Sequence, residues 1–211
     1  AFDSVNSVGG VALPALFKAL GVEQVHGLFD EPTGDFAHNP EPLPEHLTAI
    51  CEEVRRTSAD VGFVVDPDVD RLAIVDEHGA FFGEEYTLVS IADYLLSLNG
   101  GGNTVSNLSS TRALRDVTLR HGGSYYAAAV GEVNVVTKMK EVNALIGGEG
   151  NGGVIYPELH YGRDALVGIA LFLTMLAKSG RSVSELRATY PSYYMSKQRV
   201  ELTAGIDPQS L

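Results

Sequence analysis

The sequence has little of what marks secreted, membrane-spanning or zinc-binding proteins. Cys51 is its single cysteine, so neither an internal disulfide nor a cysteine-based zinc site can form. Its longest strongly apolar run, residues 165–177, is shorter than the ~20 residues that a membrane-spanning helix needs. No signal peptide is visible at the start. We therefore expect a protein of the reducing cytoplasm with no membrane partner.

Positive charge is also scarce. The 15 Lys and Arg residues are outnumbered by 27 Asp and Glu residues, which gives a formal net charge of -12. A surface of this sign repels phosphate backbones, so we expect no nucleic-acid partner. The same field repels a sugar phosphate, so any phosphate site must gather Arg, Lys or backbone N–H groups locally.

Apolar residues, in contrast, are plentiful enough for a sizeable core. Hydrophobic residues make up 45% of the chain and charged residues 20%, which argues against disorder. Strand-like and helix-like segments alternate in two rounds, divided near Phe81. This alternation indicates βαβ units, so we expect an α/β fold with two similar three-layer α/β domains and mostly parallel mixed sheets. The expected strands cover residues 2–5, 22–29, 61–65, 72–75, 80–82, 104–107, 124–130 and 144–146, and the expected helices residues 11–20, 45–58, 84–97, 111–121, 133–141, 162–178 and 183–190.

The strongest chemical signal is a run of alternating carboxylates directly after the apolar segment 61–65. Asp66, Asp68 and Asp70 occupy every second position and can converge on one point. Three like charges are costly together unless a cation neutralises them, and hard oxygen ligands favour Mg²⁺ or Mn²⁺. Arg71 follows at once and offers a planar donor fork suited to phosphate.

Two other interpretations of this segment are less favoured. One is a solvated acidic turn, which the buried strands expected on both sides disfavour. The other is an EF-hand calcium loop, since Asp66, Asp68, Asp70 and Glu77 fall at its positions one, three, five and twelve. Its sixth position needs Gly but here is Arg71, and the flanks indicate strands rather than helices.

A glycine-rich segment, residues 147–153, is the second signal. Glycines let a backbone approach a ligand closely, while Glu149 offers acceptors and Asn151 both donors and acceptors. This pair suits vicinal sugar hydroxyls, whereas Glu149 would repel a bare phosphate. No Lys-Ser/Thr follows the glycines and the dinucleotide spacing is absent, so neither a P-loop nor a Rossmann fingerprint is indicated. A structural turn remains the alternative.

Taken in order, the two segments resemble the α-D-phosphohexomutase superfamily, which includes phosphoglucomutase, phosphomannomutase and phosphoglucosamine mutase. The resemblance covers essentially the whole chain and extends to residues 3–10 and to the segments 59–63 and 75–79 that flank the carboxylates. It implies the second and third of the family's four domains. Residues 1–81 would be the metal-binding domain, residues 82–197 the sugar-recognition domain, and residues 198–211 a linker toward a missing fourth domain.

The resemblance also implies a function for a longer parent protein. In the family, the first domain carries a phosphoserine and the fourth clamps the substrate phosphate, and phosphate moves between the 1- and 6-positions of a hexose phosphate. The chain begins without Met and inside a strand-like segment. We therefore expect an excised piece, inactive alone, of an intramolecular phosphotransferase.

Roles follow residue by residue from the resemblance. Asp66, Asp68 and Asp70 would ligate Mg²⁺, and Arg71 would contact the phosphoryl group. The sugar hydroxyls would be held by Glu149, assisted by Asn151, with Glu132 as a further polar contact.

Some positions depart from the family pattern. Pro67 and Val69 stand where the family has Gly, and we expect them to forbid positive φ and to alter the loop and its metal affinity. Asn151 stands where Ser is common and Gly153 where His often follows, so the hexose could be glucosamine, glucose or mannose. Residues 37–40 resemble the family's phosphoserine motif, but Ala37 stands in place of the serine and has no hydroxyl, so we interpret the segment as structural.

Other interpretations remain open. Asp164 is expected to cap the long helix, and a structural role is preferred for Arg163 over substrate contact. A non-catalytic, metal-dependent sugar-phosphate binding module is the main alternative function. A phosphatase with an Asp nucleophile is disfavoured, because no second acid or base follows an Asp-x-Asp opening near the N-terminus.

Overall fold

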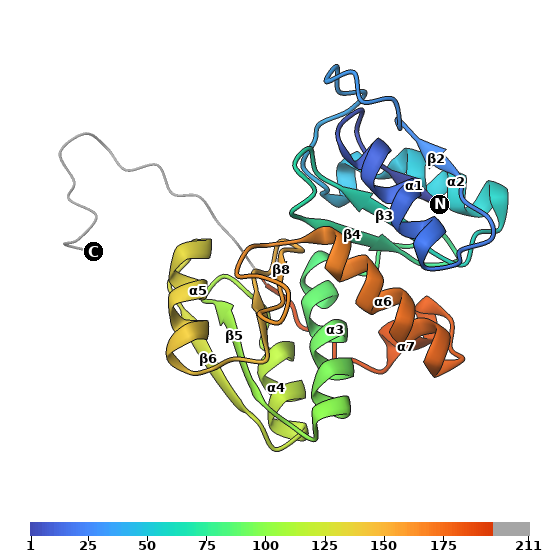
Figure 1. Ribbon diagram of the computed structural model, residues 1–211. Helices are drawn as coiled ribbons and strands as arrows, with labels where there is room; N and C mark the ends of the chain where they lie inside the picture. The colour runs from blue at the N-terminus through green and yellow to red at the C-terminus, as the bar shows by residue number, and fades with distance from the viewer. Residues whose placement is uncertain (196–211) are drawn as a thin grey trace.

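Two four-stranded sheets organise residues 1–195, the part of the chain that the computed structural model describes (Figure 1). The strand orders are β2-β1-β3-β4 and β6-β5-β7-β8. In each sheet the first three strands are parallel and the last is antiparallel. The expected α/β fold with two similar, mostly parallel mixed sheets is therefore confirmed.

The elements follow the alternation expected from the sequence. The first unit contains β1 (Phe2–Asp3), α1 (Gly9–Ala19), β2 (Gly27–Leu28), a short 3-10 helix η1 (Pro44–His46), α2 (Thr48–Thr57), β3 (Gly62–Val65) and β4 (Leu72–Val75). The second contains α3 (Glu84–Asn99), β5 (Asn103–Asn107), α4 (Ala113–Arg120), β6 (Ser124–Ala128), α5 (Glu132–Glu141), β7 (Ile146–Gly148), β8 (Val154–Ile155), α6 (Ala165–Ser179) and α7 (Val183–Ala188).

Helices cover both faces of each sheet. Helix α2 packs on one face of β3 and β4, and α5 packs on one face of β5, β6 and β7. Helices α3 and α6 lie between the sheets, where each contacts β4 of the first sheet and a strand of the second (Figure 1). The two units therefore share one set of interior helices.

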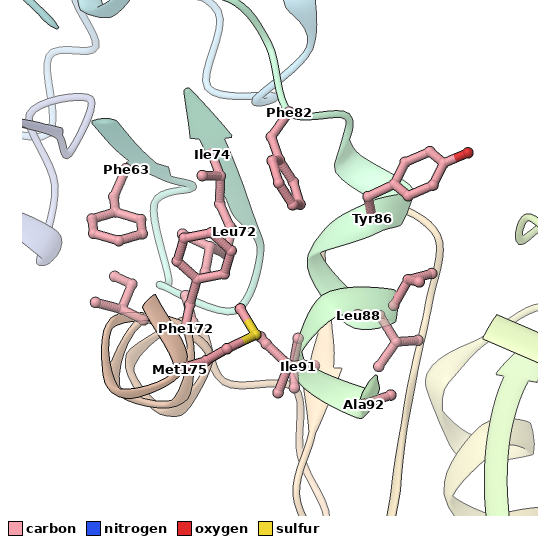
Figure 2. Packing of buried hydrophobic residues seen from close by; sticks show 14 of the residues in the cluster. Phe63, Leu72, Ile74, Phe82, Tyr86, Leu88, Ile91, Ala92, Phe172 and Met175 are labelled. Carbon is pink, nitrogen blue, oxygen red and sulfur yellow. The ribbon is translucent and has the colours of Figure 1, made fainter. Parts of the chain in front are cut away.

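The core between the units is continuous and apolar. Figure 2 shows Phe63 and Leu72 of the first sheet facing Phe172 of α6 and Ile91 of α3. The rings of Phe63 and Phe172 meet edge to face with centroids 6.1 Å apart. Each such side chain, once fully buried, contributes roughly 1.5–3 kcal/mol, so this core holds the two sheets in a fixed relation.

Polar side chains at the N-termini of α6 and α7 determine where these helices begin. The Asp164 carboxylate accepts hydrogen bonds from the backbone N–H groups of Leu166 and Val167, which confirms its expected role as the cap of α6. Ser182 and Glu185 form a capping box at the start of α7. The position of Asp164 also fixes Arg163, the residue before it.

Some expected elements were wrong. The strand expected over residues 22–29 is only Gly27–Leu28, because half of this segment is exposed and none of it is buried. No strand covers residues 80–82, where a single bridge joins Val75 and Phe81. The helix expected over residues 45–58 starts as η1 and resumes at Thr48. The last strand, β8, was not expected.

The expected linker, residues 198–211, lies outside the described residues, and the domain limits 1–81 and 82–197 stay predictions. No helix within residues 1–195 is both long and apolar enough to cross a bilayer.

Candidate functional site

The three carboxylates of the β3–β4 loop lie together. All four residues of β3 are buried, and Asp66 follows them directly with 1% exposure. Asp66, Asp68 and Asp70 each present an oxygen, and these oxygens lie within 4.8 Å of one another. The structure thus brings together the residues that the sequence singled out as metal ligands.

Asp66 is held by the backbone and side chain that follow it. Its Oδ1 accepts hydrogen bonds from the backbone N–H groups of Asp70 and Arg71, both at 2.9 Å, and its Oδ2 accepts one from Arg71 Nε at 2.7 Å. Burial alone would raise the pKa of Asp66, but the N–H groups of Arg71 outweigh it and lower that pKa. Asp66 is therefore an ionised anchor of the loop.

Asp70 has one oxygen in use and one without a donor. Its Oδ2 accepts a hydrogen bond from Arg163 Nη2, whereas its buried Oδ1 has no hydrogen-bond partner. Burial, with the neighbouring charge of Asp66, raises the pKa of Asp70 to about 6. A buried, unsatisfied carboxylate oxygen is costly, and a divalent cation would satisfy it. This donor set of carboxylate oxygens fits Mg²⁺.

Val69, between two of these carboxylates, adopts a left-handed backbone. Its φ is 61°, which corrects the expectation that a β-branched residue forbids positive φ here. Burial and a hydrogen bond compensate for the strain. Val69 is only 8% exposed and packs in the core, and its carbonyl accepts a hydrogen bond from Ala165 N at 2.9 Å. The β3–β4 loop, residues 66–71, is thereby joined to the first turn of α6. This segment is called the metal loop below, after its candidate ligands.

Glu149, in the β7–β8 loop, is buried and well supplied with donors. Its Oε1 accepts from Asn107 Nδ2 at 2.8 Å and from Gly131 N at 3.3 Å, and its Oε2 accepts from Arg163 Nη1 at 3.0 Å. Only 5% of the residue is exposed. An ionised carboxylate has about four acceptor positions, so one remains for a ligand hydroxyl.

The two other predicted sugar contacts lie beside Glu149. Asn151 Oδ1 accepts from Gly153 N at 3.2 Å and shapes the glycine loop. Glu132 opens α5, and its Oε1 accepts from Arg163 N at 3.1 Å. Asn151 thus lies in the same loop as Glu149, and Glu132 is linked to Glu149 through Arg163.

The metal loop and the glycine loop are in direct backbone contact. Leu72 N donates to Gly152 O at 3.2 Å, and Arg71 forms an antiparallel bridge with Gly153. Gly152 has φ 89°, and a Cβ added there would lie 2.4 Å from Leu72 O. Glycine at this position is therefore a condition for the approach of the two loops.

Arg163 makes more contacts in the site than its place in the sequence indicates. Its guanidinium bonds Asp70 and Glu149, and its Nε lies 3.4 Å from Glu132 Oε2. No local signal identified these contacts, because Asp70 and Glu132 lie far from Arg163 in the sequence.

The segment around Ala37 is bonded to the first unit through His38 and the backbone of Ala37. His38 Nε2 lies 3.0 Å from Oδ2 of the buried Asp3, and Ala37 N donates to Asn6. These bonds hold the loop that carries Glu41. The Glu41 carboxylate lies 3.4 Å from Arg71 Nη1.

Comparison with protein-family models gives two matches. The model of phosphoglucomutase/phosphomannomutase alpha/beta/alpha domain II matches residues 1–79. The model of alpha/beta/alpha domain III of the same family matches residues 83–193.

Known proteins similar to the chain carry related names. It is 38% identical over 198 residues to a phosphoglucomutase/phosphomannomutase of Thermococcus kodakarensis, covering 93% of this chain and 43% of the relative. It is 33% identical over 193 residues to a phosphomannomutase/phosphoglucomutase of Pseudomonas putida, covering 90% of this chain and 42% of the relative. The chain thus spans less than half the length of these relatives.

Solved structures share the fold. A phosphoglucomutase/phosphomannomutase family protein of Burkholderia thailandensis superposes with a TM-score of 0.83 at 33% identity, over 90% of this chain and 42% of the other. An N-acetylphosphoglucosamine mutase of Aspergillus fumigatus, solved with GlcNAc-6P and magnesium, gives a TM-score of 0.68 at 16% identity, over 90% and 48%. At that identity the second likeness concerns the fold alone.

Proposed function

We propose, because the chain belongs to the phosphoglucomutase/phosphomannomutase family, that it is the central part of a phosphosugar mutase. The parent protein would transfer phosphate between the 1- and 6-positions of a hexose phosphate through a phosphoserine outside this chain. The proposal depends on one observation. Asp66, Asp68 and Asp70 lie together with one buried oxygen unsatisfied, and a single arginine, Arg163, lies between them and Glu149. First and fourth domains, supplied by the rest of the polypeptide, would complete the site.

The carboxylates would hold a divalent cation. Asp66, Asp68 and Asp70 supply hard oxygen ligands, and the lowered pKa of Asp66 keeps it ionised at neutral pH. When bound, Mg²⁺ would neutralise charge on the transferring phosphoryl group. Asp66 also orients Arg71 through the 2.7 Å bond to Nε, and Glu41 accepts from Nη1 at 3.4 Å, which leaves Nη2 to contact a phosphoryl oxygen.

The sugar would be recognised by acceptor side chains of the second unit. Glu149 keeps an acceptor position open, and Asn151 and Glu132 flank it. Fixed acceptors of this kind select hydroxyl groups and reject analogues that lack them, because a buried acceptor left unpaired costs about 1–3 kcal/mol. The family names leave the hexose open among glucose, mannose and glucosamine.

The first test concerns the cation and uses this chain. Mn²⁺ binding, followed by the loss of the free-ion electron paramagnetic resonance signal, should weaken at least about tenfold in Asp68→Asn, since ligand charge sets affinity. Asp60→Asn is the matched control, because Asp60 is exposed and stands before β3 rather than after it. Equal affinity in both variants would remove the assigned metal site.

The second test concerns the reaction and uses the full parent protein. Supplied with glucose, mannose or glucosamine 1-phosphate and Mg²⁺, it should form the 6-phosphate and carry phosphate on a serine detectable by mass spectrometry. A parent that binds the sugar phosphate yet is never phosphorylated would instead support a non-catalytic, metal-dependent sugar-phosphate binding module. The Pro67 and Val69 substitutions in the carboxylate loop motivate that second candidate.

A further inference from the structure

Arg163 joins carboxylates from three separate segments. Nη2 bonds Asp70 in the metal loop, Nη1 bonds Glu149 in the glycine loop at 3.0 Å, and Nε lies 3.4 Å from Glu132 at the start of α5. The Arg163 side chain is 20% exposed, so its pairs with Asp70 and Glu149 are partly shielded from water. Among the described residues, no other arginine links the two loops through their acidic side chains.

The chain holds Arg163 in this place from several sides. Its backbone N donates to Glu132 at 3.1 Å, and the next residue, Asp164, caps α6. Its stem passes over Gly153, where an added Cβ would lie 2.5 Å from Arg163 Cδ. A side chain at position 153 would therefore displace the Arg163 side chain from this place.

The two oxygens of Asp70 have different roles in this geometry. Oδ2 is bonded to Arg163, whereas the buried Oδ1 is unsatisfied and belongs to the carboxylate cluster. A cation at Oδ1 would fix or shift the Asp70 carboxylate. Since a guanidinium is planar and its two N–H edges move together, a change at Nη2 is passed to Nη1 and so to Glu149.

We propose that Arg163 is a positioning residue that couples the cation site on the metal loop to the glycine loop that carries Glu149. The inference rests on the proposed function for the identity of the cation and of the sugar, but the mechanical link does not. By thermodynamic reciprocity, a cation that orders the glycine loop is bound more tightly when that loop is occupied, by the same factor.

The link is tested first without metal, by hydrogen exchange at residues 147–153. Asp70→Ala removes the partner of Nη2 and should raise exchange in these residues at least about threefold. Asp68→Ala is the matched control, because it removes an acid from the same loop that has no bond to Arg163 among residues 1–195. Equal exchange in the two variants would overturn the coupling.

The second arm adds Mn²⁺ to the wild type and to Arg163→Met, Arg163→Lys and Gly153→Ala. In the wild type, Mn²⁺ should slow exchange at residues 147–153. All three variants should lose this response while still binding Mn²⁺, since Lys keeps the charge but not the fork and Gly153→Ala displaces the arginine without removing it. Arg120→Met, which removes an arginine paired with Asp93, should respond like the wild type.

The outcomes separate this inference from the proposed function. A response of residues 147–153 that persists in Arg163→Met would show that the Leu72–Gly152 backbone contact carries the signal and would overturn the role of Arg163. A wild type that binds no Mn²⁺ would remove the proposed metal site, while the comparison of Asp70→Ala with Asp68→Ala still decides the coupling. Melting temperatures, measured alongside, separate local loosening from general destabilisation.

Discussion

Val69 offers a quantitative test of the strain in the metal loop. Its left-handed φ of 61° costs an L-residue about 1–2 kcal/mol. The side chain, 8% exposed, contributes through burial. Val69→Ala keeps a Cβ in the left-handed region but loses two methyl groups, so the free energy of unfolding should fall by about 2 kcal/mol, at ~0.8 kcal/mol per group plus the cavity left behind.

Val69→Gly should be no less stable than Val69→Ala, and more stable by about 0.5 kcal/mol. Removing the Cβ releases the ~1–2 kcal/mol of strain, while glycine costs about 0.5–1 kcal/mol in backbone entropy. The order of stability of the Ala and Gly variants at this site is therefore the reverse of the usual one. Urea unfolding followed by circular dichroism measures both variants, with the two midpoints compared at a common slope.

Val11, in helix α1 with 66% exposure, is the matched control. There Gly should be less stable than Ala by about 1 kcal/mol, as in any exposed helix. The glycine-minus-alanine difference should therefore shift by about 1.5 kcal/mol between the two sites. The same difference at both sites would refute the reasoning, because it would mean that no strain is stored at Val69.

Two further predictions concern protonation. Because burial and the charge of Asp66 raise the pKa of Asp70 to about 6, proton and cation compete there below pH 6, and Mn²⁺ affinity measured by calorimetry should fall about tenfold per pH unit; a flat profile from pH 7 to 5 would contradict this. Burial opposes ionisation of Glu77, but hydrogen bonds from Ser184 and Ser182 outweigh it and lower its pKa to about 2. Glu77→Ala should therefore lower the free energy of unfolding by about 1 kcal/mol, as loss of a helix cap does. This contribution is full above the unfolded-state pKa near 4.5 and is lost as the pH falls toward 2, so a wild-type advantage that grows on acidification would count against it.

Local signals were sufficient to predict much of the fold and the membership of the site. The apolar, β-branched run before Asp66 indicated a buried strand, and β3 is buried at every position. The alternation of the aspartates predicted that they converge, and their oxygens do. Asp164 was identified as a helix cap from its place before an apolar run, which the structure confirms. Each of these depends on residues close together in the sequence.

The features that were missed depend on contacts between distant segments. Arg163 bonds Asp70 across 93 positions of the chain, and nothing around Arg163 announces that partner. The positive φ of Val69 was judged unfavourable from its side chain alone, yet core packing and the bond from Ala165 outweigh that preference. The length of β2 was overestimated, because no residue of the segment 22–29 is fully buried in the fold. Tertiary context thus overrode local propensity at these positions.

The position of the site follows from the likeness of the two sheets. Their strand orders, β2-β1-β3-β4 and β6-β5-β7-β8, are equivalent, so the metal loop between β3 and β4 and the glycine loop between β7 and β8 are the same hairpin in each unit. Equivalent hairpins that face each other can pair antiparallel, as Arg71 and Gly153 do. The candidate cation ligands and the candidate sugar contacts therefore lie on two hairpins that pair with each other, and we expect a change in the shared core of α3 and α6 to alter the distance between them. Destabilising that core should impair cation and sugar binding together, whereas a change within one hairpin should first affect its own ligand.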